Sequence, residues 1–470
     1  MDSIGQLQKN LLEGKVTSVE IVNACLQNIE KTKGHNAYIE VYAEEVLSQA
    51  AALDAKITEG GTLGPLFGVV FSIKDNLCYE NHHSTAGSKI LEGFKSPYSA
   101  TVVSRILASD ALIIGRTNCD EMCMGSTNET SIYGPVKNAL DKESVSGGSS
   151  GGAAVAVALD TCHISIGSDT GGSIRQPAAF NGVYGYKPTY GTIPRWGLIA
   201  YGSSLDTIGL LGRNIADFQK VMSVLSGSDE QDSTAYKPAI QFNLTEKPRK
   251  NFKIAYSQDL CAHPDMDKAH QLHMAEYIAA LKEKGHTLTS VDMPLTNFYV
   301  PTYYVLATAE ASSNLSRYDG IRYGHRTSAA VEDYREMMTL SRSEGFGEEV
   351  KKRIMLGTYV LSEGYYDAYY KKAQKVRRMI KENLETILKS HDLFLLPTTT
   401  SDPWRIGQKP TDPLIHYLAD IYTVLASLSG FPAISIPSKR STHSKIPVSA
   451  QFISKKGTDN DLLEMSRILS

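Results

Sequence analysis

Apolar and polar positions near the start of the chain repeat with the spacing of an α-helix. Within residues 17–29, apolar side chains recur at i, i+3, i+4 and i+7 from Val22 onward. Thr17 and Glu20 have the spacing of a capping box. A second helical pattern covers residues 43–55 and is followed by two glycines. The sequence therefore predicts a helical N-terminal part.

The spacing then changes to that of β-strands. In residues 68–74, Val69, Phe71 and Ile73 would share one face of a strand, and Lys74 would lie on the other face. Further apolar runs predict strands at 111–114, 162–167 and 393–396, and helical patterns predict helices at 101–107, 266–284 and 359–390. The basic side of the last helix favours a solvated face over a binding surface. Strands that alternate with helices indicate an α/β fold with a mixed or mostly parallel sheet.

Composition limits the classes of function. The chain has 470 residues, 42% hydrophobic and 21% charged, which is ordinary for a globular protein. A net charge of -3 argues against a broad nucleic-acid-binding surface, because such surfaces carry a basic excess. The six cysteines form no C-x-x-C pair and predict buried, reduced thiols. Residues 1–15 lack the patterns of secretory signals and transit peptides, so we expect a cytoplasmic protein.

Two clusters of glycine and serine are candidates for chemistry. Residues 147–151 match the G-x-S-x-G nucleophile elbow, but that motif requires an apolar strand before it, and residues 141–146 do not make a buried strand. The second cluster, Asp-Thr-Gly-Gly-Ser at 169–173, follows the strand predicted at 162–167. Ligands bind beyond the carboxyl ends of strands in open α/β sheets. Its successive N–H groups would suit an oxyanion, although a plain glycine loop without a ligand would have the same sequence.

A nucleophilic serine requires a base, and the residues alone leave its identity open. Among the twelve histidines, only His163 lies near a serine cluster along the chain, and His82 and His83 lie in a polar stretch; a Ser-His-Asp triad could still draw its partners from anywhere. Lys74 is the other option, because desolvation at the end of a strand favours the neutral amine. Lowering its pKa from about 10.4 to about 7–8 would require roughly 3–5 kcal/mol of environmental bias. A structural salt bridge to Asp75 is the alternative reading of this lysine.

Taken together, three separated elements resemble the amidase signature family. They are Lys74, the Gly-Gly-Ser-Ser-Gly-Gly block that contains Ser149, and the Asp-Thr-Gly-Gly-Ser-Ile-Arg block that contains Ser173. Lys74 precedes Ser149 by 75 residues, and Ser173 follows Ser149 by 24, as that family would have them. Three elements in this order and spacing are much harder to obtain by chance than one G-x-S-x-G.

The resemblance implies an α/β fold with a single large domain, in which helices cover a mixed, twisted β-sheet. Within residues 1–470, a helical part would cover about 1–60, a catalytic core about 61–215, and a C-terminal part with substrate-binding residues about 250–470.

The resemblance also implies a mechanism. Ser173 would attack an amide carbonyl and form an acyl-enzyme, while Ser149, after a cis peptide bond at Gly148, would pass a proton toward neutral Lys74. The oxyanion hole would consist of the backbone N–H groups of Thr170, Gly171, Gly172 and Ser173.

Longer blocks are similar to one branch of the family, the glutaminase subunits of tRNA-dependent amidotransferases. These blocks are residues 120–121 with 125–129, 173–178, 204–209, 309–320, 353–358 and 362–370. This resemblance implies hydrolysis of glutamine to glutamate and ammonia, with partner subunits B and C using the ammonia to amidate glutamate on tRNA(Gln), or aspartate on tRNA(Asn). It also implies no cofactor in this chain, ATP and Mg²⁺ at the partner subunit, and charged tRNA bound through that partner.

A free amino acid requires a cation for its α-carboxylate and an anion for its α-ammonium. Arg353 has a planar fork suited to a carboxylate, and Asp420 supplies an anion. The resemblance implies that these two residues and Tyr304 bind glutamine; without it, each would be a surface or salt-bridge residue.

Two other functions stay open. A stand-alone amidase for another small carboxamide would not require Arg353 with Asp420, and a non-enzymatic scaffold would not require the three catalytic positions. The chain also departs from the family pattern at Leu210, where proline is common, and at residues 122–124, where an aromatic is usual. Neither departure touches the three catalytic positions, so both concern the wall of the pocket.

Overall fold

A computed structural model describes residues 1–237, 239–243, 251–408, 419–438 and 446–470. Its strands are β1 (Tyr38–Val41), β2 (Val70–Lys74), β3 (Leu112–Thr117), β4 (Ile164–Asp169), β5 (Tyr184–Lys187), β6 (Thr207–Gly212), β7 (Lys253–Tyr256), β8 (Thr287–Ser290), β9 (Leu393–Pro397), β10 (Ala433–Pro437) and β11 (Ser449–Ile453). Within the described ranges these form one sheet of 11 strands in the order β1-β3-β2-β4-β6-β5-β10-β11-β9-β7-β8.

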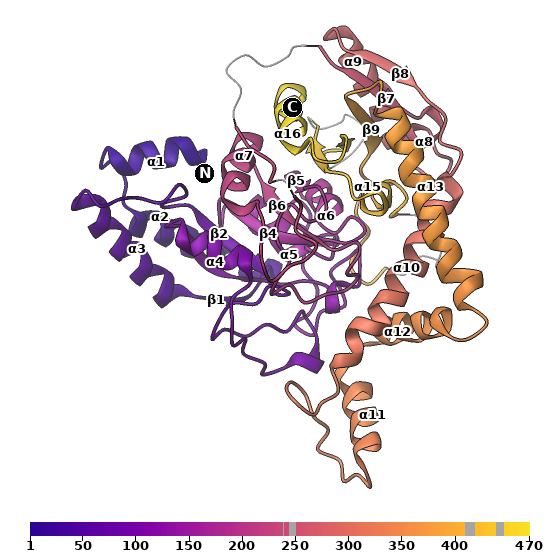
Figure 1. The fold of residues 1–470 in the computed structure, drawn as a ribbon. Helices are drawn as coiled ribbons and strands as arrows, with labels where there is room; N and C mark the ends of the chain where they lie inside the picture. Colours follow the sequence, from indigo (N-terminus) through magenta and orange to yellow (C-terminus); the bar gives the residue numbers. More distant parts are fainter. Residues whose placement is uncertain (238, 244–250, 409–418, 439–445) are drawn as a thin grey trace.

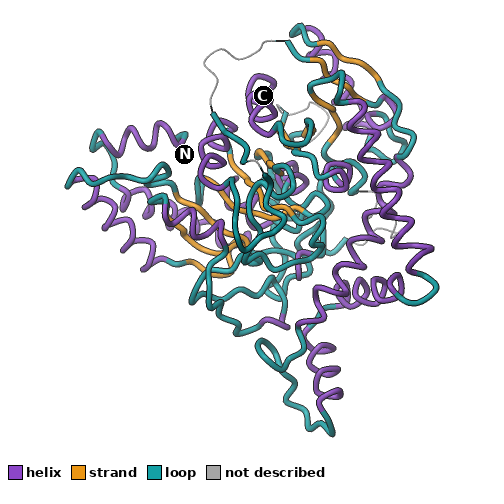
Figure 2. Tube along the Cα trace, in the orientation of Figure 1, coloured by secondary structure: helices purple, strands orange, loops and turns teal. Residues whose placement is uncertain are grey.

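The helices surround this sheet (Figures 1 and 2). They are α1 (Ile4–Leu12), α2 (Ser18–Thr32), α3 (Ala43–Thr58), α4 (Thr101–Ala108), α5 (Gly151–Ala158), α6 (Arg175–Phe180), α7 (Ile215–Leu225), α8 (Gln258–Cys261), α9 (Lys268–Glu283), α10 (Tyr299–Asn314), α11 (Tyr334–Gly345), α12 (Glu348–Leu361), α13 (Lys372–Ile387), α15 (Val424–Ser429) and α16 (Asp459–Leu469). Both parallel and antiparallel pairs occur in the sheet. The predicted fold class, a single α/β domain with a mixed sheet covered by helices, is confirmed.

The N-terminal helices form where the sequence predicts them. Thr17 caps α2, its hydroxyl accepting from the N–H of Glu20, while the Glu20 carboxylate accepts from the N–H of Thr17. This reciprocal pair satisfies two N–H groups that the helix itself leaves without partners. In Figure 1, α1, α2 and α3 lie toward the β1 end of the sheet, and α8 and α9 lie at the β7–β8 end.

Three neighbouring strands position the candidate chemistry. β2 runs parallel to both β3 and β4, so the carboxyl ends of these strands, at Lys74, Thr117 and Asp169, meet at one edge of the sheet. Every residue of β2, β3 and β4 is buried, which explains why their sequences are nearly continuous apolar runs. The loops that leave this edge carry both serine clusters.

The local backbone around Ser149 is not that of a nucleophile elbow. Residues 141–146 form a turn and two isolated bridges, and no strand directly precedes Ser149. The chain instead enters α5 at Gly151, and the first seven residues of this helix are buried. A helix of small and apolar residues on every side is typical of the interior of a protein.

The long helix predicted at 359–390 is wrong in one respect, because the helical pattern is broken. α12 ends at Leu361, a turn follows in which Gly364 has φ +84°, and a π-helical segment over Tyr366–Lys371 leads into α13. Glycine adopts that backbone conformation without steric cost, so the break occurs there. The basic residues of the stripe are exposed, as a solvated face requires: Lys371, Lys372, Lys375 and Arg378.

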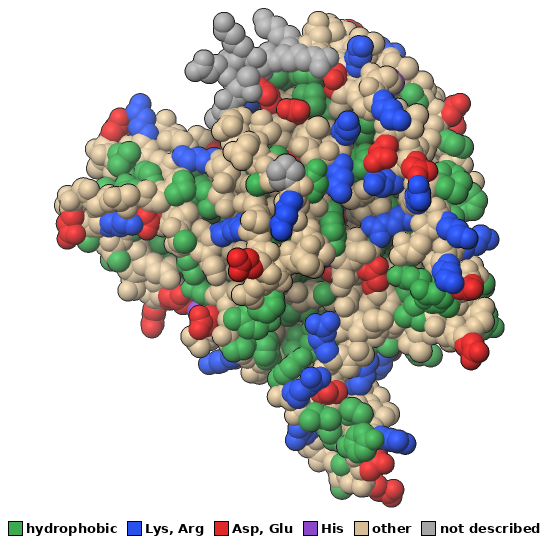
Figure 3. Space-filling model, in the orientation of Figure 1, with side chains coloured by type: hydrophobic (Ala, Val, Ile, Leu, Met, Phe, Trp, Pro, Cys, Tyr) green, Lys and Arg blue, Asp and Glu red, His purple; other side chains and the backbone are tan. Residues whose placement is uncertain are grey.

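β8 was not predicted, since it is a mostly exposed edge strand without apolar alternation. On the face drawn in Figure 3, Lys and Arg side chains are mixed with Asp and Glu side chains. All six cysteines are buried and free, as their spacing predicts. Of the helices in the described ranges, none is both long enough and apolar enough to span a lipid bilayer.

Candidate active site

Lys74 is fully buried at the carboxyl end of β2, and hydroxyl groups surround its ammonium group. Its Nζ lies 2.7 Å from Ser149 Oγ, 3.0 Å from Ser150 Oγ and 3.0 Å from Ser168 Oγ. In the part of the chain that the structure describes, no carboxylate forms an ion pair with it. The polar contacts of this buried amine are therefore to hydroxyl groups.

The alternative reading, a salt bridge between Lys74 and Asp75, is not what forms. Asp75 Oδ1 lies 3.0 Å from Arg116 Nη1, and both side chains are buried. The same carboxylate accepts hydrogen bonds from the N–H of Thr85 and the N–H of Gly87. Asp75 thus fixes the loop after β2, and the neighbouring lysine stays unpaired with it.

The peptide bond between Gly148 and Ser149 is cis, as the family resemblance implies. The N–H of Gly148 donates to Gln176 Oε1 at 3.0 Å. A side chain at position 148 would meet the Asp120 carboxylate, since a Cβ there would lie 2.0 Å from its Oδ2. Only glycine fits this position, and Ser149 beside it is fully buried against Lys74.

Ser173 closes the loop that leaves β4, and its side chain is 9% exposed. The N–H of Ser150 donates to the carbonyl of Ser173 at 3.1 Å, which joins the two serine clusters through the backbone. Among the described residues, nothing accepts a hydrogen bond from the N–H groups of Gly171, Gly172 or Ser173. The hydroxyls of Ser149 and Ser173 share no hydrogen bond there either. The proposed nucleophile is therefore placed beside the Lys74–Ser149 pair without a direct contact to it.

A small pocket lies over this loop and forms the cavity of the site. It is lined by Cys123, Gly125, Ser126, Gly148, Gly171, Gly172, Ser173, Tyr303, Tyr304, Arg353 and Asp420. The structure therefore brings the predicted nucleophile together with all three residues predicted to bind glutamine. Lys74 and Ser149 do not line the cavity themselves, whereas Gly148 and Ser173 do.

Arg353 projects from α12 and is held in one orientation. Its Nε donates to Glu349 Oε1 at 2.8 Å, and its Nη1 donates to the hydroxyl of Tyr201 at 2.8 Å. The rings of Tyr201 and Tyr304 flank the guanidinium, with centroids 5.6 and 5.4 Å from Cζ. Its side chain is 11% exposed, and Nη2 has no hydrogen-bond partner in the described residues, which leaves it free to bind an anion in the cavity.

Asp420 supplies the opposite charge. The hydroxyl of Tyr304 donates to Asp420 Oδ2 at 2.8 Å. Burial raises the pKa of the Asp420 carboxyl to about 6, against the opposing effects of the Tyr304 hydroxyl and the Arg353 guanidinium. The carboxylate is thus formed at neutral pH but is destabilised enough to gain from a cationic partner.

None of the histidines in the described ranges lines the cavity beside Ser173. Burial lowers the pKa of His163 to about 3, and its Nδ1 accepts from the N–H of Val70 at 3.1 Å. His82 stacks on Tyr79, and its Nε2 lies 2.8 Å from the Glu45 carboxylate.

Several residues of the site gave no signal in the sequence. Tyr201, which orients Arg353, is one tyrosine among 25. Ser150 and Ser168, which contact Lys74, lie in the first cluster and directly before the second, but are not marked out from the other serines. Their spacing to Lys74 becomes meaningful only when β2 and β4 are known to be neighbours.

The geometry agrees with what comparisons with known proteins find. The family model described as Amidase matches residues 20–463. The A subunit of glutamyl-tRNA(Gln) amidotransferase from Chlorobium phaeobacteroides is 46% identical over 441 residues, which cover 93% of this chain and 92% of that protein. The protein of the same name from Legionella pneumophila is 44% identical over 465 residues, which cover 99% of this chain and 95% of that protein.

Solved structures lead to the same family. The crystal structure of the glutamyl-tRNA(Gln) amidotransferase A subunit from Thermotoga maritima has a TM-score of 0.79 at 34% identity, covering 98% of this chain and 93% of that chain. A crystal structure described as an amidase has a TM-score of 0.83 at 25% identity, covering 100% of this chain and 99% of that chain. With a family model over most of its length and relatives above 40% identity over nearly all of it, the chain belongs to the amidase signature family.

Proposed function

We propose that the chain is the glutaminase subunit of a tRNA-dependent amidotransferase. The observation that carries the proposal is the pair of opposite charges, Arg353 and Asp420, in the cavity that contains Ser173. An α-amino acid presents one carboxylate and one ammonium, and a simple aliphatic or aryl amide presents neither. The relatives named as A subunits of glutamyl-tRNA(Gln) amidotransferase, at 44% and 46% identity, support the same substrate.

Substrate binding follows from the geometry of these groups. Arg353 would take the α-carboxylate of glutamine through its unoccupied Nη2, while Glu349 and Tyr201 hold the rest of the guanidinium. Asp420 and the hydroxyl of Tyr304 would take the α-ammonium. The side-chain amide would then extend toward Ser173.

The proposed mechanism requires Lys74 to accept a proton as a neutral amine, as the family resemblance implies. The hydroxyl of Ser150 donates to the carbonyl of Ser168, and Ser168 Oγ already accepts from Asn76 Nδ2, so both hydroxyl oxygens are placed to accept the two N–H bonds of a neutral amine. The third partner, Ser149 Oγ at 2.7 Å, then faces the lone pair. In this arrangement Ser149 donates to Lys74 and can take a proton from Ser173.

The reaction balances with these groups alone. Ser173 Oγ bonds to the amide carbon, and its proton moves through Ser149 to Lys74. The negative charge on the carbonyl oxygen is met by the N–H groups of residues 170–173, and losing one such donor typically costs about 3 kcal/mol in the barrier. The proton returns to the amide nitrogen as the C–N bond breaks, ammonia leaves, and water releases glutamate from the acyl-enzyme.

The partners follow from the fate of ammonia. Two partner subunits, B and C, would together amidate glutamate on tRNA(Gln). ATP and Mg²⁺ would bind to one of these partners, and the charged tRNA would be held by a partner and not by this chain directly. Aspartate on tRNA(Asn) is the alternative acceptor. The chain itself requires no cofactor for the steps above, and the cytoplasm is the expected compartment.

Ammonia release tests the proposal. Glutamine, asparagine, an aliphatic amide and an aryl amide are compared, with and without the partner subunits, and we expect glutamine to be preferred. Ser173→Ala should abolish ammonia release and leave the complex intact, whereas Ser223→Ala, an exposed serine on α7, should change neither. Hydrolysis of aryl amides with glutamine ignored would indicate a stand-alone amidase instead.

A further inference from the structure

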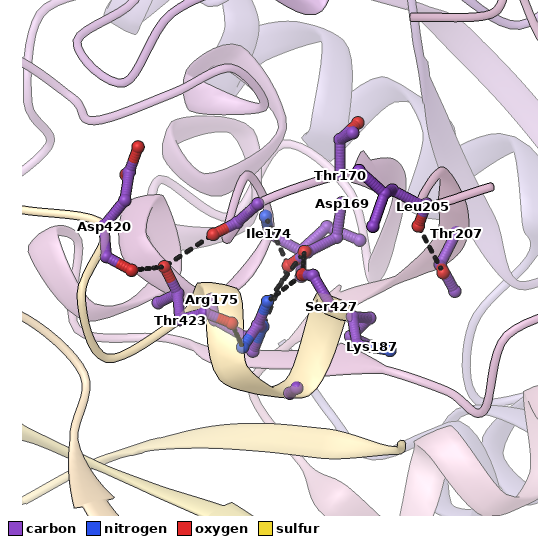
Figure 4. Close-up of polar contacts among 12 residues, drawn as sticks. Asp169, Thr170, Ile174, Arg175, Lys187, Leu205, Thr207, Asp420, Thr423 and Ser427 are labelled. Carbon is purple, nitrogen blue, oxygen red and sulfur yellow. Dashed lines mark hydrogen bonds and ion pairs between the residues drawn. The ribbon is translucent and has the colours of Figure 1, made fainter. Parts of the chain in front are cut away.

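The hydroxyl of Thr423 is hydrogen-bonded to the backbone of the loop that follows β4, residues 170–173. Thr423 is fully buried at the start of α15, and its Oγ1 donates to the carbonyl of Gly171 at 2.6 Å. The carbonyl of Asp420 lies 3.2 Å from the same hydroxyl. One side chain thus contacts both the loop that ends at Ser173 and the turn that carries the proposed ammonium-binding carboxylate (Figure 4).

The bond to Gly171 determines where the next N–H points. The described backbone contains one cis peptide, Gly148–Ser149, so the bond between Gly171 and Gly172 is trans. In a trans peptide the C=O and N–H point in opposite directions. With the Gly171 carbonyl fixed on Thr423, the N–H of Gly172 points away from Thr423, and no described residue accepts it. Gly172 lines the cavity, so this is the direction that an oxyanion donor requires.

Thr423 is itself held by a closed ring of hydrogen bonds. Its carbonyl accepts from Arg175 Nη1 at 2.7 Å. Arg175 also donates to both carboxylate oxygens of Asp169, Nε to Oδ2 at 3.0 Å and Nη2 to Oδ1 at 2.8 Å. Asp169 is the last residue of β4 and immediately precedes the loop. The ring of hydrogen bonds therefore runs from the Gly171 carbonyl through Thr423 and Arg175 back to Asp169, in the same stretch of backbone (Figure 4). The side chains of Asp169 and Arg175 are fully buried, where such bonds are strong.

The two glycines allow this close approach. A Cβ on Gly172, whose φ is +140°, would lie 2.3 Å from Thr423 Oγ1, and a Cβ on Gly171 would lie 2.5 Å from the hydroxyl of Tyr303. The loop therefore sits between Thr423 on one side and Tyr303 on the other. Because Thr423 and Tyr303 occupy the two sides of the loop, loss of the Thr423 hydrogen bond would let the Gly171–Gly172 peptide rotate while the loop as a whole stays in position.

We propose that Thr423 is a positioning residue for amide hydrolysis, which orients the Gly171–Gly172 peptide so that its N–H faces the developing oxyanion. The role rests on the proposed function because it requires the loop to be the oxyanion hole. Thr423 acts through the backbone and touches neither substrate nor leaving group. Its contribution therefore belongs to the transition state, and it should affect kcat more than KM.

The test removes the hydroxyl while keeping the shape of the side chain. In the full complex, Thr423→Val should lower kcat for glutamine roughly 10- to 100-fold, the size expected when a reacting geometry is lost without the groups themselves. KM should change less. Thr423→Ser keeps the hydroxyl and should restore kcat, and Thr423→Ala repeats the loss if the valine variant does not fold. Ser429→Ala is the matched control, because that buried hydroxyl on α15 donates to the carbonyl of Leu425 and lies outside the ring.

A second substrate separates this role from support of Asp420. The analogue of glutamine without its α-amino group cannot use the Asp420 carboxylate, yet it requires the same oxyanion donors. We expect Thr423→Val to lower kcat for this analogue by the same factor as for glutamine. A loss confined to glutamine, a kcat for Thr423→Val equal to that of the unaltered complex, or a serine variant as slow as the valine variant would each overturn the inference. If the unaltered complex ignores glutamine, the proposed function fails, and the Thr423 variants are compared on the amide that it does hydrolyse.

Discussion

The pKa of Asp420 gives the proposed substrate binding a pH dependence that can be measured. Burial raises that pKa to about 6, while the Tyr304 hydroxyl and Arg353 hold it from rising further, with a smaller opposing effect from Arg175 and a smaller raising effect from Asp169. The carboxylate exists above this pH and is protonated below it. A neutral carboxyl cannot pair with an ammonium, so KM for glutamine should be flat above about pH 6 and rise by up to about tenfold for each unit below.

The pH below which KM rises is the break in the profile, and removing the hydroxyl of Tyr304 should move this break to higher pH. That hydroxyl donates to Asp420 Oδ2 at 2.8 Å and stabilises the charged form. A hydrogen bond to a charged group contributes about 1.5–3 kcal/mol, which corresponds to about 1–2 pH units. Tyr304→Phe should therefore shift the break in KM upward by about 1–2 units.

The assay is steady-state ammonia release across pH 5–9, with glutamine and with its analogue that lacks the α-amino group. Tyr299→Phe is the matched control on α10, because that buried hydroxyl is not among the groups that shift the Asp420 pKa. We expect its pH profile to follow the unaltered protein. The reasoning is refuted if the break stays in place in Tyr304→Phe, or if the analogue, which has no ammonium, shows the same break.

Three further substitutions test other parts of the site. Arg353→Lys keeps the charge but loses the planar fork, and we expect KM for glutamine to rise about 10- to 150-fold, from about 1.5–3 kcal/mol for a charge-assisted bond, with kcat nearly unchanged. Tyr201→Phe removes the partner of Arg353 Nη1 and should raise KM by up to about tenfold, from about 0.5–1.5 kcal/mol; an unchanged KM would mean that Glu349 alone orients the guanidinium. Arg175→Met leaves the buried Asp169 carboxylate unpaired and should destabilise the fold by about 3–5 kcal/mol. Thermal denaturation measures that loss, which should shrink when Asp169→Asn is added.

Short-range patterns predicted the local structure of the catalytic side well. The capping box at Thr17, the buried strand at β2 and the strand before the second serine cluster all follow from spacing within ten residues. The contact between Lys74 and Ser149 was available only through the family resemblance, since 75 residues separate them and their meeting depends on α5 packing against β2.

The remaining parts of the site could not be predicted, for two physical reasons. Tyr201, Thr423 and Gln176 act through hydrogen bonds to residues distant in the sequence, and a single polar residue in a loop or helix has no periodicity to reveal it. The break in the helix predicted at 359–390 is a choice between two backbone conformations at Gly364, which apolar spacing does not report.

The two halves of the site therefore differ in how the chain encodes them. The proposed nucleophile, relay and base come from one stretch, 74–173, which folds onto three adjacent strands. The side chains proposed to bind the substrate come instead from α10, α12 and the turn before α15. The halves meet at few points, and Thr423 is one of them, because its hydroxyl reaches Gly171 from the turn that carries Asp420. Changes in the helices can alter which amide is bound while leaving the bonds of Lys74 untouched. A change at Thr423 would instead affect both halves. Its hydroxyl lies against the turn that carries Asp420, and it also orients the Gly171–Gly172 peptide of the proposed oxyanion hole.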